Sequence, residues 1–369
     1  MENMEMDGRY KEMPLVCISI TCYNHEKYVR QALESAINQT YGNTVIMISD
    51  DGSKDQTRDI IMDVIKEHPE KNVKTFFSES NTAFDIVEEM DSSICGKYLL
   101  GFSGDDYIGE SVVEKWVDFM ESHEEFAFSF SIPEIILEDP DSIVPAFRGE
   151  NMNQYELFES LFCEGNHICA SPMFVRSNAW KKYGCYRYQY KQLQDYERWL
   201  YVLQENEIHI FGKGELPTYY RIHKNGLSKV SLEVIQRDIV EREFLLFHVM
   251  DELASDFFLK VFGKYLLYPE DSEEFCLDCE KFLILIHAEA VPAKSVILYY
   301  FFHIGDSGFS KHIEKDYHFS RKDFWNLTGE IDALLRNLLY NEVEGRYLNI
   351  IEKQKKVIEQ LMDHCRSES

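Results

Sequence analysis

The sequence predicts an α/β protein in which a mostly parallel, doubly wound sheet is flanked by helices and followed by a helical C-terminal extension. Two observations predict the sheet: continuous apolar runs rich in β-branched residues, and amphipathic stretches between them. The two patterns alternate four times within about 110 residues, which is typical of strands joined by helical crossovers. A third observation predicts the extension, because residues 231–369 are almost wholly helical in pattern.

The alternation assigns the first eight elements in order. Strands are predicted at 15–21, 44–49, 72–78 and 97–103, and helical segments at 24–39, 50–68, 82–94 and 110–122. Asn24 is a candidate N-cap of the first helix. The stretch 50–68 turns at Gly52 before its helix, which Ser53 or Asp55 could cap.

The rest of the chain is less regular at first and then helical. Residues 125–230 mix strand-like and helical patterns. The last predicted helix, 329–363, carries apolar residues near one stripe, which suits either packing onto the chain or a coiled-coil homodimer. Packing is the favoured alternative, since Gly345 interrupts the stripe. The apolar run 295–304 has about half the length needed to span a bilayer.

Composition restricts the classes of partner. The 369 residues carry 38 Lys and Arg against 65 Asp and Glu, a formal charge of −27. Such a field repels nucleic acid and anionic lipid, so we expect no nucleic-acid partner and at most a peripheral membrane contact. A phosphate-bearing ligand would need a metal ion, a helix N-terminus or a placed basic residue.

Cysteine usage and the N-terminus indicate a reducing compartment. Nine cysteines are scattered along the chain, an odd number that does not suggest a disulfide framework. Cys276 and Cys279 form a C-x-x-C without a second pair, and we expect two helix cysteines rather than a zinc or redox site. Residues 1–13 are acidic, unlike a signal peptide. We expect a cytoplasmic protein that could work at the inner face of the cell membrane.

Polar and aromatic side chains follow three of the predicted strands. They are Tyr23 and Asn24, then Asp50 and Asp51, then Asp105 and Asp106. Because the carboxyl ends of parallel strands share one edge of a sheet, these groups should converge into a site for a nucleotide and a metal. Each acidic pair taken alone could instead be a solvated turn that caps the following helix.

Several segments resemble the family 2 glycosyltransferases, which have the GT-A fold. The resemblance lies in "PLVCISITCYNHEKYVRQALESAINQTY", "ISDDGSKDQT", "GKYLLGFSGDDY", "SPMFVRSNAWKKYGCYRYQYKQLQDYERWLYVL" and "YYRIHKNGLS", in that order. It implies a GT-A domain over 14–230, between an N-terminal tail, 1–13, and the extension, 231–369. The sequence departs from the family pattern at Thr21, where proline is usual, and at Gln194, where glutamate is usual. It also has Ser-Gly-Asp-Asp in place of Asp-x-Asp-Asp, and a reduced "SNTAF" after the third strand.

The resemblance implies a nucleoside diphosphate sugar donor, with UDP preferred, and a glycan or lipid-linked acceptor. The donor-binding residues that it implies are Thr21, Tyr23, Asn24, Asp51, Asp105, Arg221 and His223. Tyr23 would stack on the base, and Asp51 would accept the uracil imide N–H. The acceptor would be held around His167, Ser171 and Arg176.

Transfer requires that the diphosphate leaves and that the acceptor hydroxyl loses a proton. Mn²⁺ or Mg²⁺ would neutralise the departing phosphates, with Asp106 as the expected ligand and His223 as a second metal or diphosphate contact. Asp105 would contact the donor ribose, the sugar or a metal-bound water. Asp195 is the candidate catalytic base for a one-step inverting displacement, although its place suits a helix cap as well.

Two other classes stay open. A sugar nucleotidyltransferase has a similar sheet but needs a Gly-rich basic loop after the first strand, and "TCYNHEKY" has no glycine. A non-catalytic nucleotide-binding or scaffold protein would work through its helical tail. The combination of Asp51, Asp106, Asp195 and His223 argues against that reading.

Overall fold

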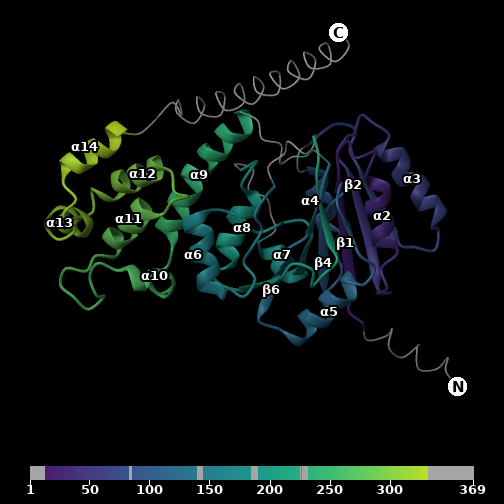
Figure 1. Cartoon of the computed structure of the whole chain (residues 1–369), viewed down its shortest axis with the longest axis horizontal. Helices are drawn as coiled ribbons and strands as arrows, with labels where there is room; N and C mark the ends of the chain where they lie inside the picture. Colours follow the sequence, from purple (N-terminus) through teal and green to yellow (C-terminus); the bar gives the residue numbers. More distant parts are fainter. Residues whose placement is uncertain are drawn as a thin grey trace, which may run out of the picture.

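The apolar runs form strands of a seven-stranded sheet at the centre of the molecule (Figure 1). The computed structural model describes residues 13–82, 85–138, 144–183, 190–224, 226 and 232–330. In the sheet order β3-β2-β1-β4-β8-β6-β9, β8 alone runs antiparallel to its neighbours. The strands are β1 (Val16–Cys22), β2 (Thr44–Asp50), β3 (Val73–Phe77), β4 (Tyr98–Ser103), β6 (Phe126–Ser131), β8 (Met173–Arg176) and β9 (Glu207–Phe211). The predicted parallel sheet is therefore confirmed.

Helices cover both faces of this sheet, as a doubly wound architecture requires. On one face Val16, Ile18 and Ile20 of β1 pack with α2 (Val29–Ile37), α3 (Thr57–Glu67) and α5 (Val112–Ser122). The other face, which includes Cys17, packs with a second group of helices. These are α4 (Asp85–Ser92), α6 (Gln154–Glu164), α7 (Ser177–Tyr183) and α8 (Gln194–Val202). Burial on both faces explains why the strands are apolar at consecutive positions.

A small second sheet, whose strand β5 follows β4 in the chain, was not predicted. Its order is β5-β10-β7, formed by Tyr107–Ile108, Thr218–Ile222 and Glu134–Leu137. The antiparallel pairing of β10 with β5 places Tyr219 opposite Tyr107, with ring centroids 4.3 Å apart. This pairing brings the segment after residue 218 against the loop after β4.

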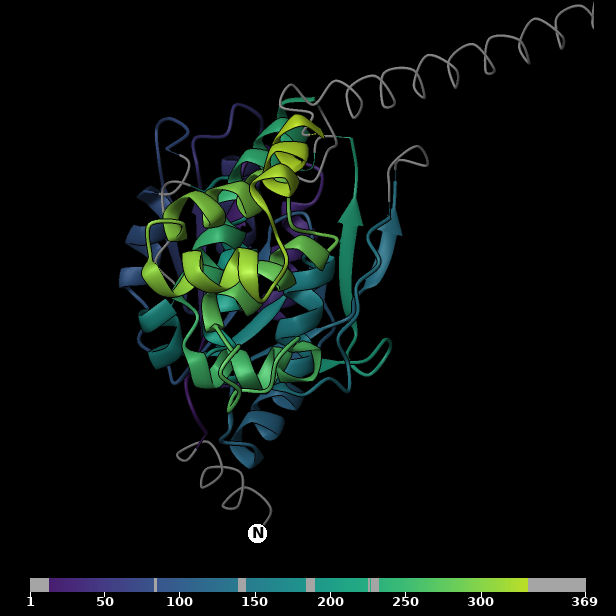
Figure 2. The same ribbon diagram turned by 90° about the vertical axis from the view of Figure 1, so that its left-hand side faces the viewer.

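The C-terminal region is helical, as predicted, and shares the core of the second sheet face. The helices are α9 (Leu232–Glu252), α10 (Ser255–Phe262), a 3-10 turn (Gly263–Tyr265), α11 (Leu277–His287), α12 (Ala293–His303), α13 (Ser307–Lys315) and α14 (Arg321–Glu330). Figure 2 shows these helices standing in front of the sheet. Phe258 and Phe262 of α10 lie in one buried cluster with Phe158 and Phe162 of α6.

Some local predictions need correction. Asn24 is not a helix cap, because its φ is +56° and α2 begins only at Val29. Asp55 does accept the N–H of Thr57, at 3.0 Å, where α3 begins. Cys279 lies in α11, whereas Cys276 immediately precedes that helix.

The remaining sequence predictions about the extension can be compared with the structure only up to residue 330, where the described residues end. No helix in the described part of the chain is long and apolar enough to cross a membrane. Most of the predicted helix 329–363, with its packing and coiled-coil alternatives, lies outside the described residues, and so does the tail over residues 1–12. The predicted homodimer and the predicted membrane contact stay predictions.

Candidate active site

The loops after three parallel strands meet at one rim of the sheet. The N–H of Asp51, after β2, donates to the carbonyl of Cys22 at the end of β1, at 3.0 Å. The N–H of Gly104, after β4, donates to the carbonyl of Thr21, at 2.8 Å. These bonds join the loops after β2 and β4 to the end of β1, so the convergence predicted from strand order is confirmed.

The loop after β2 is a tight turn held to the loop after β1. Gly52 has a φ of +73°, and a Cβ there would lie 2.4 Å from the backbone carbon of Ser80, so the turn requires glycine. Asp50 is fully buried and accepts hydrogen bonds from Ser53. Asn24 accepts the N–H of Lys54 at 2.8 Å. Asn24 and Asp50 therefore shape the turn that presents Asp51.

Asp51 itself lies at the rim and contacts the loop after β3. Its Oδ1 accepts both the N–H and the hydroxyl of Thr82, at 2.7 and 2.8 Å. Tyr23, on the neighbouring loop, is 40% exposed, as a platform for a stacked base would be. Thr21 lines a cavity of about 170 Å³ beside the rim, together with Ser103 and Ser171.

Asp105 lies between two histidines. The Nε2 atom of His223 is 3.0 Å from Oδ2 of Asp105, and Nε2 of His25 is 3.8 Å from the same oxygen. Burial alone would raise the pKa of Asp105, but the hydrogen bond from His223 and the field of His25 hold it below its ordinary value. Asp105 is therefore an ionised carboxylate beside imidazole nitrogens.

Asp106 has a different environment from its neighbour. It is 2% exposed; its Oδ1 accepts the N–H of Arg221 at 2.8 Å, and its Oδ2 accepts the hydroxyl of Ser171. Burial, followed by the charge of Asp105, raises the pKa of Asp106 well above its usual range. The solvated-turn alternative is wrong for this pair, because Asp106 is buried and joins β10 to the Ser171 segment. Its role as a metal ligand stays a prediction.

Arg221 makes several contacts within the protein, and its predicted donor contact stays a prediction. Its guanidinium donates to the carbonyl of Asp105 at 2.9 Å, to Gln31 at 2.9 Å and to Glu138 at 2.5 Å. It also lies over the ring of Tyr28, 4.7 Å from the centroid. These contacts make Arg221 a clamp that holds β10 against the loop after β4.

Asp195 lies in the first turn of α8. Its carboxylate accepts the N–H of Tyr196 at 2.7 Å and the amide of Asn166 at 3.1 Å. Burial raises the pKa of Asp195 despite these bonds, which increases its affinity for a proton. Burial raises the pKa of the Cys169 thiol, and the charges of Asp106 and Asp195 add to this effect.

The three predicted acceptor residues do not form one group. Arg176 pairs with Tyr98 at the start of β4, the end of that strand remote from the rim, and donates to backbone carbonyls there. That part of the prediction is wrong. His167 lies 2.9 Å from Ser160 through Nε2, and burial lowers its pKa. Ser171 alone joins the rim, through Asp106.

Sequence reasoning missed three residues that build the site. They are His25, Tyr28 and Glu138. The hydroxyl of Tyr28 donates to Glu138 at 2.7 Å, and the ring centroid of Tyr28 lies 4.7 Å from that of His223. The sequence signal for His25 was its place directly after Tyr23 and Asn24. No local pattern marked Glu138, which reaches the site through the pairing of β7 with β10.

Comparisons with known proteins agree with this geometry. Residues 17–184 match the family described as glycosyl transferase family 2. The chain is 27% identical over 226 residues to an uncharacterized glycosyltransferase of Haemophilus influenzae, covering 59% of this chain and 68% of that protein. It is 28% identical over 221 residues to WfaP of Escherichia coli, covering 58% of this chain and 80% of WfaP. WfaP is named as a UDP-Glc:alpha-D-GlcNAc-diphosphoundecaprenol beta-1,3-glucosyltransferase.

The fold has relatives among solved structures. S. aureus TarS, residues 1–349 in complex with UDP-GlcNAc, superposes with a TM-score of 0.53 at 16% identity, covering 76% of this chain and 82% of that one. The fold is of the GT-A type, with an acidic rim at the carboxyl ends of its parallel strands. The chain carries a glycosyltransferase domain of family 2.

Proposed function

We propose that the protein is a metal-dependent, inverting glycosyltransferase that moves a sugar from a UDP-sugar to a hydroxyl of a glycan or lipid-linked acceptor. The observation that carries the proposal is the position of Asp105 beside His223, at the rim where the loops after β1, β2 and β4 meet. The family match supports transfer over the nucleotidyltransferase and scaffold alternatives. The named activity of WfaP supports a UDP-sugar donor and a lipid-linked acceptor.

The ligand atoms at Asp105 and His223 supply part of a coordination shell for Mn²⁺ or Mg²⁺. They also distinguish Asp105 from Asp106. A carboxylate and an imidazole nitrogen are ligands that Mn²⁺ accepts readily, and Asp105 and His223 would hold the ion. Within the described residues no group of three or more His, Cys, Asp or Glu is arranged to hold a metal unaided. The donor diphosphate and water would complete the shell and, when bound, the ion would neutralise charge on the leaving phosphates. We therefore assign the ligand role to Asp105 and a positioning role to Asp106.

Tyr23 and Asp51 at the rim would bind the donor, and Asp195 of α8 would activate the acceptor. Tyr23 offers its exposed ring to the base, and Asp51 would accept the uracil imide N–H. Asp195 would take the proton of the acceptor hydroxyl as that oxygen attacks the anomeric carbon opposite the diphosphate, which inverts configuration. Its raised pKa suits a carboxylate base.

A thermal-shift measurement with UDP, with and without Mn²⁺, tests the donor site. We expect UDP to stabilise the protein and Mn²⁺ to increase that stabilisation. Hydrolysis of UDP-sugars in the absence of acceptor then separates an enzyme from a binding protein. If UDP does not change the thermal stability of the protein, with or without Mn²⁺, the proposal is contradicted.

A further inference from the structure

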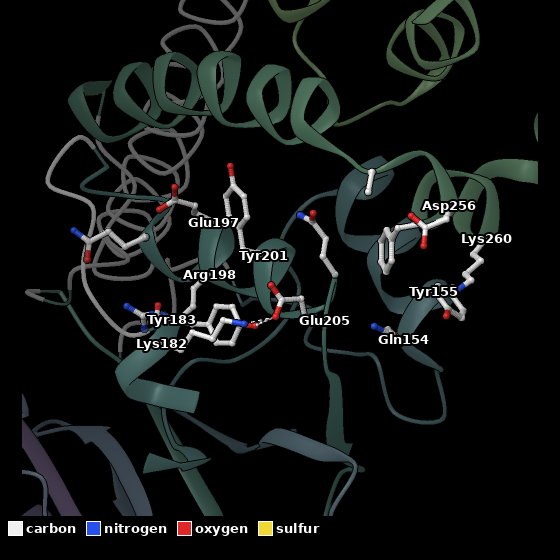
Figure 3. Close-up of a pocket in the computed structure, with 14 residues that line it drawn as sticks. Gln154, Tyr155, Lys182, Tyr183, Glu197, Arg198, Tyr201, Glu205, Asp256 and Lys260 are labelled. Carbon is white, nitrogen blue, oxygen red and sulfur yellow. Dashed lines mark hydrogen bonds and ion pairs between the residues drawn. The ribbon is translucent and has the colours of Figure 1, made fainter. Parts of the chain in front are cut away.

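A groove of about 680 Å³ runs beside helix α8, between the catalytic domain and the C-terminal helices (Figure 3), within the roughly 300–1,000 Å³ common for ligand pockets. From α8 it is lined by Gln194, Glu197, Arg198 and Tyr201. These positions are spaced by three and four residues, so they form one face of the helix. The opposite wall includes Ala254, Asp256, Phe257 and Lys260, at the start of and within α10.

The groove and the proposed catalytic base share one helix. Gln194, which lines the groove, immediately precedes Asp195 at the start of α8. Figure 3 shows Glu197 on one side of the groove and Asp256 and Lys260 on the other. The groove lining and the proposed base therefore belong to the same helix, α8.

The charge of the groove is balanced, unlike that of the whole chain. Its lining holds three cationic side chains, Lys182, Arg198 and Lys260, and three acidic ones, Glu197, Glu205 and Asp256.

All three cationic side chains already have protein partners, and Lys260 lies over the ring of Tyr155, 5.8 Å from the centroid. Lys182 pairs with Glu205, and Arg198 lies over the ring of Trp180, 4.4 Å from the centroid. This lining favours a neutral ligand over a nucleotide or another phosphate ester.

The lining also combines flat apolar faces with fixed hydrogen-bonding groups. Tyr155 and Tyr201 supply rings. The amide nitrogen of Gln154 donates to the carbonyl of Leu203 at 2.6 Å, and that of Gln204 donates to Leu200 at 3.1 Å. These bonds orient the two amides and use only their nitrogens, so each amide oxygen can accept a hydroxyl proton. Sugar rings present both C–H faces and hydroxyls and match such a surface.

We propose that this groove binds the non-reacting sugars of a neutral oligosaccharide acceptor, so that the C-terminal helices take part in acceptor selection. The proposal rests on the proposed function for its acceptor role. It predicts that the enzyme distinguishes acceptors by sugars that lie several residues from the reacting hydroxyl.

A steric block tests the groove directly. Ala254 and Asp256 line the groove and Asp256 is exposed, whereas Ser255 is also exposed and does not line it. The test compares wild type, Ala254→Trp, Asp256→Trp and the matched control Ser255→Trp on a printed array of neutral and anionic bacterial oligosaccharides, from monosaccharides to hexasaccharides. We expect wild type and Ser255→Trp to bind a subset of neutral oligosaccharides, and both groove variants to lose at least about tenfold in affinity.

Three results would overturn the proposal: no neutral oligosaccharide binding by wild type, equal binding by the groove variants and the control, or a preference for anionic glycans. Circular dichroism confirms that each variant folds, and the two groove variants check one another. UDP stabilisation with Mn²⁺, measured on the same proteins, should be unchanged in all of them. If UDP does not stabilise the wild-type protein, the proposed function is refuted. The array still reports whether the groove binds glycans.

Discussion

The Nε2 atom of His223 lies 3.0 Å from Oδ2 of Asp105, although 118 positions separate the two residues in the chain. The contact exists because β10 pairs with β5, directly after the loop that carries Asp105. It joins a segment at the end of the catalytic domain to the rim formed by its first strands. The first prediction follows from this contact.

Asp105→Asn should reduce transfer by more than about 100-fold, since the substitution removes a charged ligand from the metal site. It should also abolish the extra stabilisation that Mn²⁺ gives in the presence of UDP. Asp106→Asn is the matched control, because an amide at 106 can still accept the N–H of Arg221. The control should retain most of the Mn²⁺ effect in a thermal-shift assay. If instead Asp106→Asn loses that effect and Asp105→Asn keeps it, the ligand assignment is reversed.

Chelation gives a second measure of the same site. EDTA should stop sugar transfer by the wild-type enzyme, and added Mn²⁺ should restore it, because the leaving diphosphate needs a cation. His223→Gln should shift the Mn²⁺ dependence of the rate to higher concentration, as it replaces an imidazole next to Asp105. Activity that survives chelation would argue against metal dependence.

Asp195→Asn should lower kcat by about 10²–10⁴-fold, the usual contribution of a general base. UDP binding should stay at the wild-type level in a thermal-shift assay, since Asp195 contacts Tyr196 and Asn166 rather than the donor rim. The pH profile adds a check. Because burial raises the pKa of Asp195, the acidic limb of kcat should lie above the ordinary aspartate range of about 4. A wild-type rate in the variant would show that another group is the base.

Asp106→Ala should destabilise the fold. It leaves the N–H of Arg221 and the hydroxyl of Ser171 without their buried acceptor, at about 1–3 kcal/mol for each unsatisfied group. Urea denaturation should show a lower midpoint. Glu110→Gln, an exposed change a few residues away, should stay within about 0.5 kcal/mol of wild type. An unchanged midpoint for Asp106→Ala would mean that β10 is held by its other contacts.

Asp91 should make stability depend on pH. Burial raises its pKa to about 6, although the indole of Trp180 donates to it at 2.9 Å. The folded state therefore holds this proton more tightly than the unfolded state does. The contribution is complete below the unfolded pKa and is lost as pH rises through about 6. The difference in unfolding free energy between wild type and Asp91→Asn, measured by urea titration across this range, should fall with rising pH; a constant difference would exclude Asp91 as the cause.

Several features of the fold and site follow from local sequence. Strands that are buried on both faces must be apolar at consecutive positions, so β1, β2 and β4 could be predicted from the sequence. The rule that parallel strands share one carboxyl edge then placed Asp51 and Asp105 at one rim. The turn at Gly52 was equally legible, because only glycine fits its backbone there. The family motifs added the identity of the domain.

The tertiary structure alone decided that Asp105 faces His223 and that Asp106 accepts hydrogen bonds from Arg221 and Ser171. The local sequence does not show which of two adjacent aspartates meets a partner. The N–H of Arg221 in β10, 115 positions from Asp106, donates a hydrogen bond to that carboxylate. Long-range packing also determines the second sheet and the groove between α8 and α10. It places Arg176 away from the rim, where the sequence prediction had put it. Local patterns encode which residues avoid water, whereas the partner that each polar group meets is set by how distant elements pack.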